Sequence, residues 1–284
     1  MEELTELEEK FKEHNLSKLF GYLKKYAKNS IKVELNATTE DEIEIGKSKI
    51  GGKPDLPKNT QWFHNKTTNK PMSFIAQINF ADVKPFDIDN KLPEKGILYL
   101  FYDLEEMPWG YDPKDTVGKE VFYFDGDIAD LERRETPDNI EDENVFMPAS
   151  LMFKNEMEIP DAWSSLSKFE LSEEEHDRYW EIKEEFDDVQ NKILGHSNVI
   201  QNGMELECEL VTNGLYCGNS SGYENPKRKE LEKNIDNWNL LLQIDTNEDI
   251  DMMWGDDGRI YLWITDENLK NKKFENSWLI LQCY

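Results

Sequence analysis

One pattern occurs twice in this sequence, and it limits the possible folds more than any other feature. In residues 74–103 and again in 240–266, an apolar run ends in Gln-Ile followed by Asn or Asp, and a polar loop follows. A glycine then opens a run of the form Gly-x-Ile/Leu-Tyr-Leu in both stretches. Apolar runs separated by a turn-forming loop are typical of β-hairpins. The pattern predicts two hairpins of one design and, with them, an internal duplication of a β-hairpin-based unit.

Other segments extend these hairpins into a larger fold. Runs with a period of two predict further strands; they are IKVEL (31–35), KEVFYF (119–124), ADLERR (129–134), ELECEL (205–210) and SWLILQCY (277–284). Apolar residues at spacings of three and four predict helices over 1–30 and over 171–195. In the second helix, Ser172 and Glu175 form a capping box and Gly195 is the expected C-terminal cap.

These segments together predict the fold class and its organisation. We expect an α+β fold of mostly antiparallel sheets with covering helices, since hairpins and prolines alternate along the chain. No flexible linker interrupts it, so we predict a single compact domain over residues 1–284. Its two sheet-rich halves, 31–165 and 196–284, are expected on either side of the helix over 171–195.

Charge narrows the choice of partners. The chain has 60 acidic and 33 basic residues and a formal net charge of -27. Such a field repels nucleic acids and anionic membranes and favours a basic protein, so we predict no nucleic-acid or membrane partner. The helix over 171–195 carries an acidic stripe that is either a solvated face or a docking surface; its residues are Glu173, Glu174, Asp177, Glu181, Glu184, Glu185 and Asp188.

The cysteine count and the N-terminal residues indicate a compartment. Three cysteines are an odd number and do not form a disulfide framework. The acidic start of the chain lacks the basic and apolar regions of a signal peptide, and no apolar run is long enough to span a membrane. We therefore predict a cytoplasmic protein.

The stretch DMMWGDDGRIYLWI (251–264) raises the question of a metal site. Asp256, Asp257 and Gly258 precede a strand, which predicts a structural turn. The alternative is a calcium loop, whose oxygen ligands occupy alternating positions; the candidates are Asp245, Asn247, Asp249, Asp251 and Asp256. Ile250 stands where such a loop requires glycine, so the turn is favoured and no cofactor is predicted.

Candidate site residues cluster near the ends of the two hairpins. A cleft between the halves is one hypothesis, and tryptophans that plug the core are the alternative; the candidates are Gln77, Asn79, Trp109, Gln243, Asp245 and Trp254. His196, Cys208 and Cys217 lack the spacing of a zinc site, and Cys208 is expected on a strand as a buried thiol. No catalytic motif is present, so catalytic residues stay unassigned.

Several motifs together resemble the bacterial YwqG-like family, a domain of unknown function, over about residue 45 to the end. The motifs are IGGKPDLP (50–57), FIAQINF (74–80), LPEKGILYLFYD (92–103), PWGYDPKD (108–115), MELECELVTNGLYCG (204–218), WNLLLQID (238–245), MMWGDDGRIYLWI (252–264) and SWLILQCY (277–284). The resemblance implies a bacterial cytosolic protein with a sheet-rich fold and supplies no catalytic residues. Members occur near polymorphic toxin genes, which implies an immunity-like role.

Two functional hypotheses follow. The first is a non-enzymatic, acidic protein-binding module, immunity-like or regulatory, that engages a basic protein through its surface charge. The alternative is an enzyme or small-ligand-binding protein that works in a cleft between the two halves.

Overall fold

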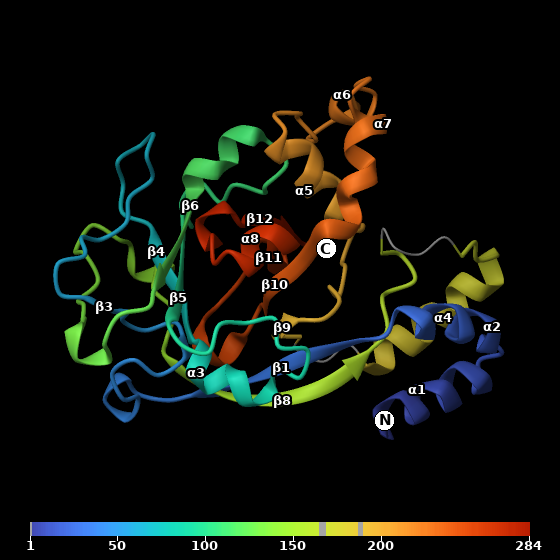
Figure 1. Ribbon diagram of the computed structural model, residues 1–284, viewed down its shortest axis with the longest axis horizontal. Coiled ribbons are helices and arrows are strands. Elements are labelled where there is room, and N and C mark those ends of the chain that lie inside the picture. Colours follow the sequence, from blue (N-terminus) through green and yellow to red (C-terminus); the bar gives the residue numbers. More distant parts are fainter. Residues whose placement is uncertain (1, 165–168, 187–189) are drawn as a thin grey trace.

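A computed structural model describes residues 2–164, 169–186 and 190–284. Within these residues, ten strands form one large sheet, and two short strands form a second (Figure 1). The strands are β1 (Lys28–Ala37), β2 (Lys49–Ile50), β3 (Asp55–Pro57), β4 (Ser73–Asn79), β5 (Ile97–Tyr102), β6 (Lys119–Phe124), β7 (Leu131–Arg133), β8 (Ala149–Glu158), β9 (Lys192–Leu194), β10 (Trp238–Asp245), β11 (Arg259–Thr265) and β12 (Trp278–Gln282).

Helices cover this sheet and connect its strands. They are α1 (Glu2–Glu13), α2 (Ser17–Leu23), α3 (Phe80–Val83), α4 (Glu173–Phe186), α5 (Glu205–Thr212), α6 (Ser220–Tyr223), α7 (Arg228–Leu231) and α8 (Asp266–Lys270). Two 3₁₀ helices matter below: η4 (Pro113–Gly118) leads into β6, and η9 (Phe274–Asn276) leads into β12. Helices and an antiparallel sheet together confirm the α+β class.

The strands of the large sheet are arranged in the same way at its two edges, in descending chain order from each edge toward the centre. The order is β12-β11-β10-β9-β1-β8-β2-β4-β5-β6, and every neighbouring pair is antiparallel. The long strands β1 and β8 pair at the centre, with Lys28 opposite Glu158 and Ala37 opposite Ala149. We call β2, β4, β5 and β6 the first half-sheet and β9 to β12 the second half-sheet.

The two predicted hairpins have the same register. Gln77 on β4 lies opposite Tyr99, and Gln243 on β10 lies opposite Tyr261. Both β4 and β10 also contain a register shift, between Phe74 and Ala76 and between Leu240 and Leu242. A bulge turns two consecutive side chains to one face of the sheet. In this way each strand presents two neighbouring apolar residues to the core.

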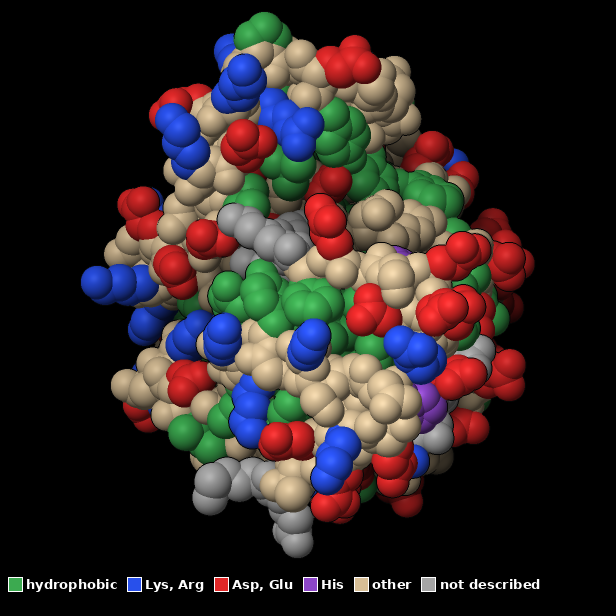
Figure 2. All heavy atoms as spheres, turned by 90° about the vertical axis from the view of Figure 1, so that its right-hand side faces the viewer, with side chains coloured by type: hydrophobic (Ala, Val, Ile, Leu, Met, Phe, Trp, Pro, Cys, Tyr) green, Lys and Arg blue, Asp and Glu red, His purple; other side chains and the backbone are tan. Residues whose placement is uncertain are grey.

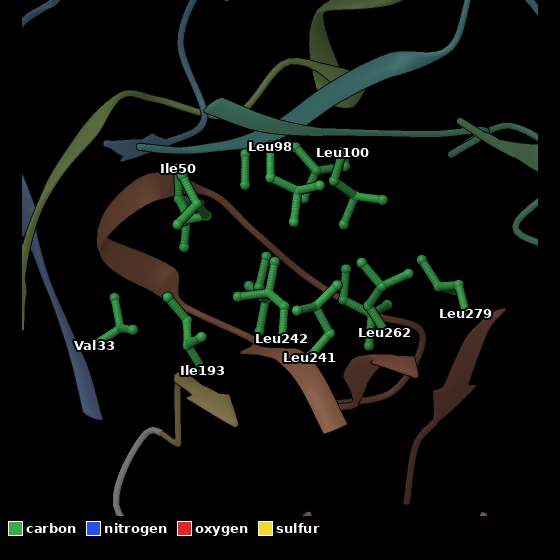
Figure 3. Close-up of a cluster of buried hydrophobic side chains, with 14 of the residues drawn as sticks. Val33, Ile50, Leu98, Leu100, Ile193, Leu241, Leu242, Leu262 and Leu279 are labelled. Atoms are coloured by element: carbon green, nitrogen blue, oxygen red, sulfur yellow. The ribbon is translucent and has the colours of Figure 1, made fainter. Parts of the chain in front are cut away.

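The core lies between the two half-sheets, which face each other. Figure 3 shows Leu98 and Leu100 of β5 above Leu242 and Leu262 of the second half-sheet. Aromatic contacts close the edges, where the ring of Tyr123 on β6 lies 4.9 Å from that of Phe274 on η9. Apolar burial is the main favourable term in folding, so this packing fixes the half-sheets against each other.

Separate helices cover the outer surfaces. Helix α5 packs Met204 and Cys208 against Trp238 and Trp278 on the outer face of the second half-sheet. Helices α1, α2 and α4 pack together around a cluster that includes Phe11 and lie beside one end of β1 and β8 (Figure 1). The capping box of Ser172 and Glu175 is present as predicted, with Glu175 N donating to Ser172 Oγ at 3.3 Å.

Three predicted elements differ from the structure. ELECEL is wrong as a strand, because it lies in α5, where Glu and Leu are favourable helix formers. The helix predicted over 171–195 ends within the described residues at Phe186, and Lys192–Leu194 is strand β9. Gly195, with φ +77°, therefore follows a strand and caps no helix. Asp188 lies outside the described residues.

Two further differences concern short or irregular strands. ADLERR contributes β7, which pairs only with β3 in the small sheet. The central strand β8 was not predicted from the sequence, because it carries no clear alternation of buried and exposed residues. None of the helices in 2–164, 169–186 and 190–284 has the length and apolar character needed to cross a membrane.

Candidate ligand-binding site

The glutamines of the two hairpins connect strands to loops. Gln77 accepts a hydrogen bond from Asp55 N at 2.8 Å and donates to Lys47 O at 2.7 Å. Gln243 accepts from Asn198 N at 2.9 Å and donates to the carbonyl of Gln190 at 2.6 Å. Both side chains are fully buried, so their polar groups are satisfied by the protein itself.

The other residues predicted for an inter-half cleft are also tied into the structure, with one exception. Asn79 donates to Gly46 O at 2.8 Å and caps α3, whereas Asp245 pairs with Arg259 at 2.9 Å. Trp254 is 0% exposed and belongs to the core, as the core alternative predicted. Trp109 is 45% exposed. None of these residues lines either cavity described below, and their role toward a ligand stays a prediction.

The acidic loop after β10 is held by hydrogen bonds of its own. Asn247 accepts from Asp249 N at 3.0 Å, and Asp251 ends this short 3₁₀ turn with φ +55°. Gly258 N donates to Trp254 O at 2.9 Å, which confirms the predicted structural turn. Across 2–164, 169–186 and 190–284, no group of three His, Cys, Asp or Glu side chains is placed to hold a metal ion.

The histidine and cysteines of the weak zinc alternative each have another environment. Burial lowers the pKa of His196 to about 3, and its Nε2 lies 2.7 Å from Tyr26 O. Cys208 is fully buried in helix α5, and not in a strand as predicted, and burial raises the pKa of its thiol. A neutral thiol in apolar surroundings is unreactive, so these residues form no site.

A cavity of about 540 Å³ opens beside α5, where η4 and the start of β6 in the first half of the chain meet the outer face of the second half-sheet. Residues of η4 and β6 form one wall, and residues of α5, β10, η9 and β12 form the others. Its floor is made of buried residues, namely Lys119, Glu209, Val211, Trp238, Ser277 and Trp278. Its rim is made of exposed residues, namely Thr116, Thr212, Asn213, Gly214, Glu275 and Asn276. This volume suits a small molecule.

Two polar groups on the floor have no partner among the described residues. Lys119, the first residue of β6, is 8% exposed and takes part in no hydrogen bond or ion pair through its side chain. The Ser277 Oγ at the start of β12 is buried without a hydrogen bond. Burial lowers the pKa of Lys119 to about 8. Buried polar groups are nearly always paired, so unpaired ones on the floor of a cavity are candidates for contact with a ligand.

The carboxylate on the floor is, by contrast, fully engaged. Glu209 accepts from Trp238 Nε1 at 2.9 Å, from Asn234 at 3.0 Å and from Asn213 at 3.3 Å. These bonds orient Trp238, whose ring lines the cavity. This site was not predicted from the sequence. One signal was available, because Lys119 alternates with buried Val121 and so belongs to the buried face of its strand.

A second cavity of about 300 Å³ lies between α1, α4 and the ends of β8 and β9. Two of its lysines pair with carboxylates of the protein. Lys183 lies 2.8 Å from Asp161, and Lys192 pairs with Glu158. These two lysines therefore differ from Lys119, for which no ion pair is found among the described residues.

The helices α1 and α4 carry an exposed acidic surface. Figure 2 shows the side on which these helices lie in Figure 1, and Asp and Glu side chains gather along one edge of it. The exposed acidic residues, which we call the acidic helical face, are Glu6, Glu8, Glu9, Glu13, Glu173, Glu174, Asp177 and Glu181. The side chains of Glu184 and Glu185 and all of Asp188 lie outside the described part of the chain.

A family model matches most of this chain. It covers residues 48–283 and describes a domain of unknown function, DUF1963. The chain belongs to the DUF1963 family. No curated protein matches the chain at the significance required. The DUF1963 region contains both hairpins and every residue that lines the cavity of Lys119, whereas α1, α2 and β1 precede it.

Proposed function

We propose that this DUF1963 protein binds a small polar molecule in the cavity beside α5, where residues of its two halves meet. The observation that carries the proposal is the pair of buried, unpartnered polar groups, Lys119 and Ser277, on the floor of a cavity of ligand size. Stable proteins rarely leave such groups unsatisfied, unless a function uses them. This is the inter-half alternative of the sequence analysis, with different residues in the site.

The rim and walls support the same proposal. Trp238 and Trp278 offer aromatic surface, and the rim offers hydroxyl and amide groups that can orient a ligand. Most of the residues that line the cavity are polar or charged, which suits a polar ligand. The walls come from both half-sheets, so a ligand here would bridge them.

A blocking substitution tests this function. Thr116 is an exposed rim residue, and Thr116→Trp places a bulky ring at the mouth of the cavity. Thr67→Trp is the matched control, at an exposed position outside the cavity. In a thermal-shift screen of small metabolites, we expect hits with the wild type and with Thr67→Trp that disappear with Thr116→Trp. Hits unaffected by Thr116→Trp would refute this location.

A basic protein partner is the second candidate, and the acidic helical face supports it. Charge complementarity would speed the association, and salt would weaken it. The test compares the wild type with a variant carrying Glu173→Gln, Glu174→Gln, Asp177→Asn and Glu181→Gln. In affinity capture at low and high salt, we expect one stoichiometric basic protein that is lost in high salt and lost with the variant. A partner retained by both would contradict a role of this face.

We also infer that the chain arose by duplication of a hairpin-based unit. Matching contacts outside the hairpins support this. Lys49 of β2 pairs with Glu40, which also accepts from Lys53 N, and Lys192 of β9 pairs with Glu158, which also accepts from His196 N. The mirrored strand order supports it too. From the motifs quoted above, we further propose a YwqG-like protein of the bacterial cytoplasm.

A further inference from the structure

We propose that the ligand of this cavity carries an anionic group, a carboxylate or a phosphate, and that the ammonium group of Lys119 pairs with it. This inference rests on the proposed function, because it names the chemical class of the molecule that occupies the same cavity. It assigns the recognition of charge to one residue, so it can fail while the cavity still binds ligands.

The other buried cations of the described residues all have an anionic partner. Lys49 lies 3.7 Å from Asp55 and also pairs with Glu40, and Arg259 lies 2.9 Å from Asp245. Lys192 pairs with Glu158 in the same manner. Burial of an ammonium or guanidinium group is unfavourable unless an anion compensates it, and these three follow that rule.

Lys119 departs from the rule although the chain has 60 acidic residues. Its neighbour Glu120 pairs with Lys66 at 3.3 Å, and Lys66 also disfavours the charge on Lys119. Of the carboxylates that line the cavity, Glu209 is held by Trp238 and Glu275 lies exposed at the rim. Neither forms an ion pair with Lys119. An anionic group of a ligand would supply the ion-pair partner that Lys119 does not find among the described residues.

Further groups suit an anion at this place. Ser277 Oγ is a buried hydroxyl without a partner in the described structure and can donate to a carboxylate or phosphate oxygen. Asn276 donates to Asn268 Oδ1 at 3.1 Å and lies with it on the wall. Hydrogen bonds to an ionised acceptor are about twice as strong as neutral ones, so one lysine and one hydroxyl are sufficient for selectivity.

Ionisation of Lys119 makes the binding pH-dependent. Burial lowers its pKa to about 8, with Glu120 raising and Lys66 lowering it, and Glu209 and Glu275 also face the cavity. Near neutral pH most Lys119 side chains are protonated and can pair with an anion. Anion affinity should fall as the pH rises above the pKa, because the neutral amine offers no charge.

Three probes of similar shape test the inference: phenyl phosphate, benzoate and the neutral benzyl alcohol. Their affinities are measured by calorimetry with the wild type, Lys119→Met and Lys119→Arg. We expect the wild type to bind at least one anion about tenfold or more tighter than benzyl alcohol, as a charged hydrogen bond permits. Lys119→Met should lose this preference, and Lys119→Arg should retain part of it. Phenyl phosphate and benzoate distinguish a phosphate from a carboxylate ligand.

The outcomes separate this inference from the proposed function. If all three probes bind the wild type and Lys119→Met alike, and Thr116→Trp abolishes binding, the cavity binds ligands and the anionic class is wrong. If Thr116→Trp leaves the binding of every probe unchanged, the proposed location itself fails. Selective loss of the anions with Lys119→Met, in a variant that unfolds cooperatively, supports both. Circular dichroism of each variant verifies that the fold is retained.

Discussion

Lys119→Met should stabilise the unliganded protein, because the lysine is buried without a compensating partner. Methionine has a similar length and no charge, so it can fill the same space on the cavity floor. Lys119 is 8% exposed and forms no side-chain ion pair within the described residues. Residues kept for binding often lower stability, and their removal restores it.

The pKa of Lys119 gives the magnitude. Its fall from 10.5 to about 8 corresponds to about 3 kcal/mol of unfolding free energy at about 1.4 kcal/mol per pH unit. The unfolded chain binds this proton up to higher pH than the folded one, so the penalty is complete below pH 8 and fades as the pH rises to 10.5. The unfolding free energy gained by Lys119→Met should likewise be largest below pH 8 and fade as the pH rises to 10.5.

Urea denaturation at a series of pH values, in buffers free of phosphate and carboxylates, measures the effect. We expect the unfolding free energy of Lys119→Met to exceed that of the wild type near pH 7 and to match it near pH 10.5. The control is Lys49→Met, which leaves the carboxylates of Glu40 and Asp55 without their lysine and should destabilise. A Lys119→Met variant that is less stable than the wild type near pH 7 would refute the reasoning.

Further predictions concern the scaffold. Burial lowers the pKa of His196 to about 3, so the protein should lose stability as the pH falls from 6.5 toward that value. In acid unfolding monitored by circular dichroism, His196→Gln should reduce this loss. Gly195→Ala forces a side chain onto a residue with φ +77°, against Glu158, and should lower the urea midpoint; an unchanged midpoint would contradict this strain. Trp254→Ala removes a fully buried ring and should lower the unfolding free energy measured by urea denaturation by about 3 to 5 kcal/mol. A loss under about 1 kcal/mol would contradict its place in the core.

The hairpins could be predicted because their information is local. Alternation of apolar residues and a turn signal such as Asp257-Gly258 specify a hairpin without reference to the rest of the chain. Helix α5 could not, because its alternating glutamates suggest an exposed strand face. The buried Glu209 of α5 accepts hydrogen bonds from Trp238 and Asn234, which are distant in sequence. Local patterns contain no information on such long-range partners.

The candidate site shows the same limit more strongly. A lysine at the start of a strand is unremarkable in the sequence, and its lack of a partner emerges only when η9, β12 and α5 surround it. The hairpin residues Gln77 and Gln243, by contrast, attract attention by recurring in both halves. Their hydrogen bonds to adjacent loops account for that recurrence in structural terms. Polar residues that recur in a fold can therefore reflect its architecture.

The most direct test of ligand binding in the cavity beside α5 is the response of two indole groups to phenyl phosphate. Trp238 and Trp278 line the cavity, and phenylalanine substitutions at each would assign their indole N–H signals in a ¹H–¹⁵N spectrum. We predict that both signals shift together and saturate near pH 7, while the signal of core Trp254 stays in place. Saturating binding in calorimetry with no change at Trp238 or Trp278 would contradict the account.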